Sequence, residues 1–149
     1  MSKKKIYLAG AIGCYKDCPE KAKEWRRYVN FFLHVKGLEN EWEVFDPTNY
    51  YNYWNPTHKT EKEIMRYEFN QIKHSTVALV NLKDIDKSIG TSDEILFSYI
   101  NNIPVIGFLD DSDDVNEYVH PWKIEQIDRI ETGEKALENV LDYILEYYS

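Results

Sequence analysis

The stretch "TVALVNL", Thr76 to Leu82, decides the expected fold. It is almost purely apolar, which is typical of a strand that is covered on both faces. Such strands belong to parallel sheets that carry helices on each side. A polar loop over residues 83–89 follows, and "GTSDEILFSY", residues 90–99, then opens a helix that we predict over residues 91–101.

Apolar runs alternate with stretches of helical spacing along the rest of the chain. Strands are predicted over residues 5–10, 42–47, 76–82 and 103–109, with a short edge strand within 123–130. Helices are predicted over residues 19–36, 61–74, 91–101 and 134–148. In the helix over residues 61–74, the spacing places Ile64, Met65, Phe69 and Ile72 inward.

The alternation of strands and helices predicts the fold class. It implies βαβ units with right-handed crossovers, and therefore a doubly wound α/β fold with one parallel sheet. About five strands in a chain of 149 residues favour the flavodoxin-like order 2-1-3-4-5. We expect a single domain over residues 1–149, because there is no repeat, linker or low-complexity segment.

Composition excludes several function classes. A net charge of -8 argues against a nucleic-acid polymer as partner, since phosphate backbones require a basic face. No segment approaches the roughly 20 apolar residues that span a bilayer, and the start lacks a signal peptide, so we expect a cytoplasmic protein without membrane contact. Cys14 and Cys18 form an isolated CxxxC pair, which we interpret as incidental.

In a parallel sheet, ligands bind at the carboxyl ends of the strands. Three segments that follow strands therefore supply candidate binding residues. The first is the "GAIG" loop, where glycine lets the backbone approach a ligand. The candidates over all three segments are Gly10, Ala11, Ile12, Asp46, Pro47, Ser88, Gly90 and Thr91.

Glu94 has two interpretations. Thr91 and Glu94 have the spacing of a capping box, which would make Glu94 a structural residue in the first helical turn. The helix dipole at that position would also keep the carboxylate ionised, as a nucleophile at a sheet edge requires. The two roles compete for one side-chain geometry, so both remain open at this point.

Glu68, within "RYEFNQIKH", is the second candidate carboxylate. It is either a general acid or base near the same edge, or an ordinary exposed helical residue. Two carboxylates in different surroundings are a recurring arrangement in glycosyl-bond chemistry. The aromatic loop "NYYNYWNP", residues 49–56, either stacks on a nucleobase or packs against a partner.

The sequence lacks the motifs that are typical of several other kinds of chemistry. The four histidines have no metal-ligand spacing, so we predict no metal. The "GAIG" loop matches neither GxGxxG nor a P-loop, and no GxSxG elbow is present. We therefore expect no bound cofactor and no acyl-transfer chemistry.

An ordered set of motifs resembles a known family. "KIYLAGAI", "WR" at residues 25–26, "VFDP" at 44–47, "VALVNL", "SIGTSDE" at 88–94, "PVIGF" and "HPW" at 120–122 follow one another over nearly the whole chain. No single motif is decisive. The set is similar to the nucleoside 2-deoxyribosyltransferase family, which includes deoxynucleoside monophosphate N-glycosidases.

The resemblance implies roles for individual residues. Glu94 matches the family glutamate that attacks the anomeric carbon of deoxyribose, and Tyr7 matches the tyrosine that orients it. Glu68 aligns with a family aspartate that handles the proton of the base, so the sequence departs there by one methylene. Ser88 occupies a position where serine helps the glycosidases to hold phosphate. The loop after the first strand offers Lys16 where those relatives place an arginine.

These observations predict an enzyme that cleaves the N-glycosidic bond of a 2'-deoxynucleoside or deoxynucleotide through a glutamate nucleophile. The deoxyribosyl group would pass to another base or to water, without metal or cofactor. The resemblance also implies a homo-oligomer, since family members complete their sites with a neighbouring chain. The alternatives are a non-catalytic nucleotide or nucleoside sensor on the same fold, and an inactive relative in which Glu94 only caps its helix.

Overall fold

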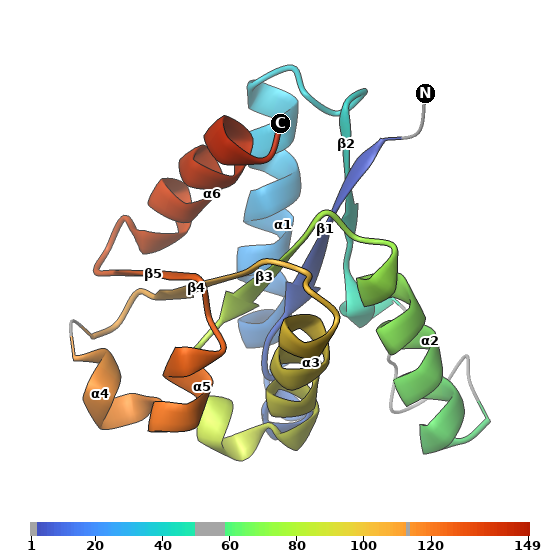
Figure 1. Ribbon diagram of the computed structural model, residues 1–149, viewed down its shortest axis with the longest axis vertical. Coiled ribbons are helices and arrows are strands. Elements are labelled where there is room, and N and C mark those ends of the chain that lie inside the picture. The colour runs from blue at the N-terminus through green and yellow to red at the C-terminus, as the bar shows by residue number, and fades with distance from the viewer. Residues whose placement is uncertain (1–2, 50–58, 113) are drawn as a thin grey trace.

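The computed structural model describes residues 3–49, 59–112 and 114–149. They form one five-stranded sheet in the order β2-β1-β3-β4-β5, in which every neighbouring pair is parallel. Helices cover both faces of the sheet (Figure 1). The predicted doubly wound α/β fold and its strand order are therefore confirmed.

The element bounds follow the sequence pattern closely. The strands are β1 (Lys4–Ala9), β2 (Trp42–Phe45), β3 (Val77–Asn81), β4 (Val105–Leu109) and β5 (Arg129–Thr132). The α-helices are α1 (Glu20–Val35), α2 (Glu61–Lys73), α3 (Ile89–Ile100), α4 (Val115–Tyr118), α5 (Pro121–Glu125) and α6 (Ala136–Tyr147). Short 3₁₀ turns are η1 (Gly13–Tyr15), η2 (Pro47–Asn49) and η3 (Ile85–Lys87).

Two apolar layers hold the helices against the sheet. On one face, α1 and α6 pack over alternate strand residues that include Ile6 and Leu8 of β1. On the other face, α2 and α3 pack over the intervening residues, which include Tyr7 and Ala9. Because side chains alternate along a strand, β1 places the Tyr7 ring on the α2–α3 side of the sheet.

The last third of the chain departs from the prediction. The edge strand expected within residues 123–130 forms only at 129–132, because α5 occupies residues 121–125. The His120 side chain accepts a hydrogen bond from the Trp122 N–H, and Pro121 starts the helix. Proline fits that first position because its missing N–H would have no partner there. Neither α4 nor α5 is long enough to show helical periodicity in the sequence.

A second departure concerns Met65, which was predicted to face inward. Its side chain is 46% exposed, whereas Ile72 on the same helix is fully buried. Met65 instead lines a cavity. None of the helices in the described residues is both long and apolar enough to cross a membrane.

Candidate active site

A cavity of about 400 Å³ opens at the carboxyl end of the sheet. Its lining comes from the loop after β1, one face of α2, and the segment from η3 into α3. The volume lies within the range of small-molecule binding sites. The predicted binding residues that line it are Gly10, Ile12, Ser88, Gly90 and Thr91, together with the carboxyls of Glu68 and Glu94.

The start of α3 decides between the two interpretations of Glu94. Helix α3 begins at Ile89, two residues earlier than predicted, and Ser88 is its N-cap. The Ser88 hydroxyl accepts a hydrogen bond from the Thr91 N–H at 3.3 Å and contacts the Thr91 hydroxyl at 2.7 Å. Glu94 consequently lies in the second turn. The predicted Thr91–Glu94 capping box is wrong, because Ser88 has taken the capping position.

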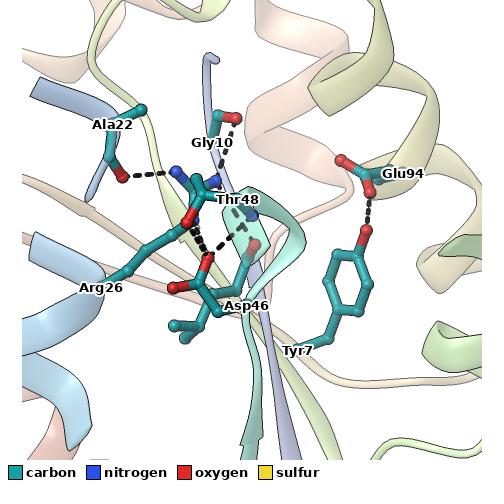
Figure 2. Close-up of polar contacts among 8 residues, drawn as sticks. Tyr7, Gly10, Ala22, Arg26, Asp46, Thr48 and Glu94 are labelled. Carbon is teal, nitrogen blue, oxygen red and sulfur yellow. Dashed lines mark hydrogen bonds and ion pairs between the residues drawn. The ribbon is translucent and has the colours of Figure 1, made fainter. Parts of the chain in front are cut away.

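Glu94 instead contacts Tyr7. The Tyr7 hydroxyl donates a hydrogen bond to Glu94 Oε2, as Figure 2 shows. The Tyr7 ring is fully buried and stacks on Phe45, with ring centroids 5.3 Å apart. Burial, followed by the nearby charge of Glu94, holds the pKa of Tyr7 well above its usual range, so its hydroxyl keeps the proton that it donates. Glu94 is thereby held in one orientation.

Glu68 and Glu94 form a pair of carboxyls within hydrogen-bonding reach of each other. Burial, with the charge of Glu68 as second cause, raises the pKa of Glu94 to about 8. Burial also raises the pKa of Glu68, to about 7, while the Arg26 charge opposes that rise. The pair therefore shares a proton near neutral pH, as neighbouring carboxyls do when they cannot both ionise.

This electrostatic result corrects an expectation from the sequence. The dipole of α3 was expected to keep Glu94 ionised, but the pKa of Glu94 is raised. A helix dipole acts mainly on its first turn and is weaker than the removal of a carboxylate from water. Glu94, in the second turn and only 8% exposed, therefore follows burial rather than the dipole.

Behind the loop after β1, Asp46, a predicted binding residue, forms a buried ion pair with Arg26, for which the sequence analysis predicted no role. Arg26 Nε is 3.6 Å from Asp46 Oδ1, and the Arg26 side chain is fully buried. Asp46 also accepts hydrogen bonds from the backbone and hydroxyl of Thr48. The sequence could have indicated Arg26 by its position. It lies four residues after Ala22 and directly after Trp25, on the inward-facing side of a helix.

Three predicted binding residues lie elsewhere. Among the described residues, the cavity lining includes neither Ala11, Asp46 nor Pro47. Ala11 is buried, and Asp46 is committed to Arg26 and Thr48. The predicted stacking loop lies mostly outside the described residues, which resume at residue 59.

A further contact connects two loops at the rim of the cavity. The Tyr15 hydroxyl, in η1, donates a hydrogen bond to the Asp84 carboxylate, just before η3. The two turns carry the lining residues Gly13 and Lys87. Cys14, between Gly13 and Tyr15, is a free and exposed thiol. The Tyr15–Asp84 bond therefore fixes the separation of the loops that follow β1 and β3.

The assembled site suits chemistry at an electrophilic carbon. It offers one carboxyl oriented by a phenol, a second carboxyl that exchanges a proton with it, and a partly apolar cavity with room for a planar ring. Ionised, the first carboxyl is a nucleophile, and the protonated second carboxyl is a general acid. These are the two groups that cleavage of a glycosidic bond requires.

Comparison with solved structures reveals close architectural neighbours. A 2-deoxyribosyltransferase from Bacillus psychrosaccharolyticus superimposes with a TM-score of 0.67 at 19% identity, over 93% of this chain and 91% of that one. The fold is shared with a deoxyribosyltransferase. A CMP N-glycosidase from Clostridium botulinum has a TM-score of 0.61 at 18% identity, over 97% and 99% of the two chains.

A conserved protein from Enterococcus faecalis gives a TM-score of 0.71 at 17% identity, over 97% of this chain and 99% of that one. No protein-family model matches the sequence, and neither does any curated protein. At these identities the likeness establishes the fold, and it agrees with the architecture that the sequence motifs implied. Function has to be argued from the site.

Proposed function

We propose that the protein cleaves the N-glycosidic bond of a 2'-deoxynucleoside or its monophosphate and transfers the deoxyribosyl group to a second base or to water. The observation that carries this proposal is the buried Glu94 carboxyl, held by the Tyr7 hydroxyl beside Glu68 at the cavity. The shared fold with a deoxyribosyltransferase and an N-glycosidase supports the same chemistry.

The proposed reaction proceeds in two displacements. Glu94 Oε attacks the anomeric carbon, the bond to the base nitrogen breaks, and its electron pair leaves with the base, which takes a proton from Glu68. The acceptor, a base nitrogen or water, then gives its proton to Glu68 and attacks the same carbon, which releases the Glu94 carboxylate. Two inversions retain the configuration of the sugar.

Tyr7 has a positioning role in this scheme. Its hydroxyl binds one oxygen of Glu94, which leaves the second oxygen for the anomeric carbon. The same hydrogen bond lowers the pKa of Glu94, against the effects of burial and of the Glu68 charge, because it stabilises the ionised form. Tyr7→Phe is therefore expected to reduce kcat by about 10-fold to 100-fold, with a smaller effect on KM.

One observation favours the alternative, a sensor that binds the same ligands without turnover. The raised pKa of Glu94 means that the carboxyl is partly protonated at neutral pH, and a protonated carboxyl is a poor nucleophile. The third reading, an inactive relative in which Glu94 is a helix cap, loses its basis because Ser88 caps α3.

The decisive experiment measures base release. The protein is incubated with the four deoxynucleosides, their monophosphates and CMP, with and without a free acceptor base, and products are separated by chromatography. Wild type should release or exchange base, and Glu94→Ala should not. A 2-fluoro sugar substrate analogue should add one covalent adduct at Glu94, located by mass spectrometry. Binding of a ligand without any release of base would support the sensor instead.

A further inference from the structure

One hydrogen bond at the rim of the cavity joins segments that are far apart in the sequence. The Tyr15 hydroxyl donates to Asp84 Oδ2, and 69 positions separate the two residues. Among the described residues, this is the one side-chain hydrogen bond between the turn after β1 and the turn after β3. Within the same part of the chain, the cavity lining includes neither Tyr15 nor Asp84, and the reaction proposed above uses neither.

Asp84 has an unusual backbone conformation, and its carboxylate is fully committed. Its φ of 56° lies in the left-handed region, which aspartate and asparagine tolerate better than most other side chains. Oδ2 accepts the bond from Tyr15, and Oδ1 lies 3.5 Å from Lys87 Nζ. The bond from Tyr15 lowers the pKa of Asp84, so the carboxylate is ionised at neutral pH and the hydrogen bond is charge-assisted.

Short hydrogen-bonded turns connect Asp84 to the start of α3. The Lys87 N–H donates to the Asp84 carbonyl at 2.9 Å, and the Ser88 N–H donates to the Ile85 carbonyl at 3.1 Å. The Ser88 hydroxyl in turn accepts the bond from the Thr91 N–H. A displacement of Asp84 would therefore move Lys87 and Ser88, which both line the cavity.

Tyr15 is connected to the cavity in the same way on the side of β1. Its N–H donates to the Ile12 carbonyl at 3.0 Å, and the Lys16 N–H donates to the Gly13 carbonyl at 3.3 Å. Ile12 and Gly13 line the cavity. The Tyr15–Asp84 bond thus joins two sides of the cavity, residues 12–13 and residues 87–88, while the joined side chains themselves stay outside the lining.

We propose that Tyr15 and Asp84 are a positioning pair for the ligand: their hydrogen bond holds residues 12–13 and residues 87–88 at the separation that the ligand requires before it binds. A site that is already in its binding conformation loses less conformational entropy on binding. This inference rests on the proposed function only for the identity of the ligand, because the pair would position the two sides for any ligand of this cavity.

Tyr15→Phe isolates the contribution of the hydroxyl. The phenyl ring keeps the contact with Lys21, whose Nζ lies 5.9 Å from the ring centre. The two turns would hold the ground state and the transition state equally, so the loss should appear in binding and not in the chemical step. We expect Kd and KM to rise about 5-fold to 20-fold and kcat to change less than about 2-fold. A pair that only stabilised the fold would lower Tm and leave KM unchanged.

Calorimetric titration measures Kd for the four 2'-deoxynucleosides and their 5'-monophosphates. The binding series uses a Glu94→Gln background, so that no turnover occurs during the titration, and KM and kcat are measured with Glu94 in place. Asp84→Asn completes a double-mutant cycle, because asparagine tolerates the left-handed backbone and removes the charge. The double variant should bind about as weakly as Tyr15→Phe alone. Losses that multiply would overturn the proposal.

Two further variants serve as controls. Tyr99→Phe removes a hydroxyl from a tyrosine that is 55% exposed on α3. Lys83→Met breaks the ion pair in which Lys83 Nζ lies 3.5 Å from Asp111, so it loosens the turn after β3 without touching the Tyr15–Asp84 bond. Both variants should keep the Kd of wild type. Unchanged Kd in Tyr15→Phe, or an equal loss of affinity in Lys83→Met, would refute the positioning role.

If Tyr15→Phe does not fold, Asp84→Asn decides with the uncharged deoxynucleosides: weaker binding supports the pair, and unchanged binding overturns it. A protein that binds a ligand, loses affinity in Tyr15→Phe and releases no base would refute the proposed function and retain the pair. Base release with the same KM in wild type and Tyr15→Phe would retain the function and refute the pair. A wild type that binds none of these compounds would overturn both.

Discussion

At the scale of the residue, the properties of Glu94 depend on its burial. The carboxyl belongs to a helix whose start it does not stabilise, and it lies against a phenol and a second acid. We expect a carboxyl in these surroundings to lower the stability of the fold, because its burial is unfavourable. Residues placed for function commonly lower stability in this manner.

Replacing Glu94 with Gln separates its effect on stability from its expected effect on activity. The raised pKa means that the folded protein holds a proton that the unfolded chain loses above about pH 4.5, so the stability of wild type falls as pH rises from there to about 8. Glu94→Gln does not titrate. It should be more stable than wild type at pH 8 by on the order of 2 kcal/mol, and closer to wild type at pH 5.

Urea unfolding of both proteins at pH 5 and pH 8 measures this difference. Glu138→Gln, an exposed substitution on α6, is a suitable control. A stability difference between Glu94→Gln and wild type that stays constant with pH would show that Glu94 is not buried as described. The same variant should lose at least about 10³-fold in kcat.

In the proposed reaction, the carboxyl pair would also determine how activity depends on pH. The productive form carries one proton, on Glu68, so activity should fall towards acid as Glu94 is protonated and towards alkali as Glu68 loses its proton. Glu68→Gln places a neutral side chain beside Glu94, as in the productive form, so the acidic limb should stay close to its position in wild type and the alkaline limb should disappear. It should lower kcat by about 10²-fold or more.

The measurement is kcat/KM for base release between pH 5 and pH 9, with wild type and Glu68→Gln compared on one substrate. An acidic limb that moves by more than about one pH unit in Glu68→Gln would contradict the placement of the productive proton on Glu68. Retention of the alkaline limb would mean that another group supplies the proton.

At the scale of the element, the start of α3 combines a structural task with a position on the cavity. Ser88 caps the helix and lines the cavity beside Lys87. Two substitutions distinguish these tasks. Ser88→Ala removes the cap and should cost about 1 kcal/mol. Ser88→Asp preserves the cap, since aspartate is an equally good N-cap, but adds a negative charge to the cavity.

If the substrate carries a phosphate near Ser88, Ser88→Asp should raise KM for monophosphates at least about 10-fold and leave the deoxynucleosides unaffected. Thermal unfolding should show Ser88→Asp near wild type and Ser88→Ala below it. An equal change in KM for both substrate classes would mean that the phosphate does not bind near Ser88, or that the substrate carries no phosphate.

The end of β1 is constrained by close packing. A Cβ at Gly10 would lie 3.0 Å from the Trp25 ring and 3.3 Å from the Asn81 Cβ. Gly10→Ala should therefore destabilise the protein by about 1–3 kcal/mol and displace the loop that lines the cavity. At Gly90, in α3, a Cβ would meet nothing within 4 Å, so Gly90→Ala should preserve or raise stability. Thermal unfolding of the two variants side by side tests this contrast.

The elements also show how far the sequence predicts this molecule. Apolar runs such as "VALVN" located the strands because both faces of a parallel sheet are buried. The motif "GTSDE" located Glu94 but not its surroundings, since protonation depends on groups from β1 and α2. Helix α5 depends on one histidine cap and one proline, which periodicity does not detect.

At the scale of the whole molecule, one surface is more apolar than the net charge of -8 suggests. We define the α2–α3–α5 face by its exposed apolar side chains, which are Met65, Ile89, Leu96, Ile100 and Trp122. These helices cover the same side of the sheet (Figure 1). Met65 and Ile89 also line the cavity, so this face adjoins the candidate active site.

We expect this face to mediate a homo-oligomer. Light scattering coupled to size exclusion should give wild type a mass of at least two chains, and the double variant Leu96→Asp/Ile100→Asp a mass of one. Phe31→Asp, an equally drastic change at an exposed position on α1 across the sheet, should leave the mass unchanged. A monomeric wild type at tens of micromolar would contradict this expectation.

The Tyr15–Asp84 bond has a practical consequence for spectroscopy. It fixes the turn that carries Cys14, next to the lining residue Gly13. A fluorophore attached to Cys14 in a Cys18→Ser background would report cavity occupancy by its emission. Partial desolvation, followed by the nearby Asp84 charge, raises the pKa of the exposed Cys14 thiol, so labelling proceeds best at mildly alkaline pH. The turn after β1 thus provides a built-in attachment point for screening ligands without any assay of turnover.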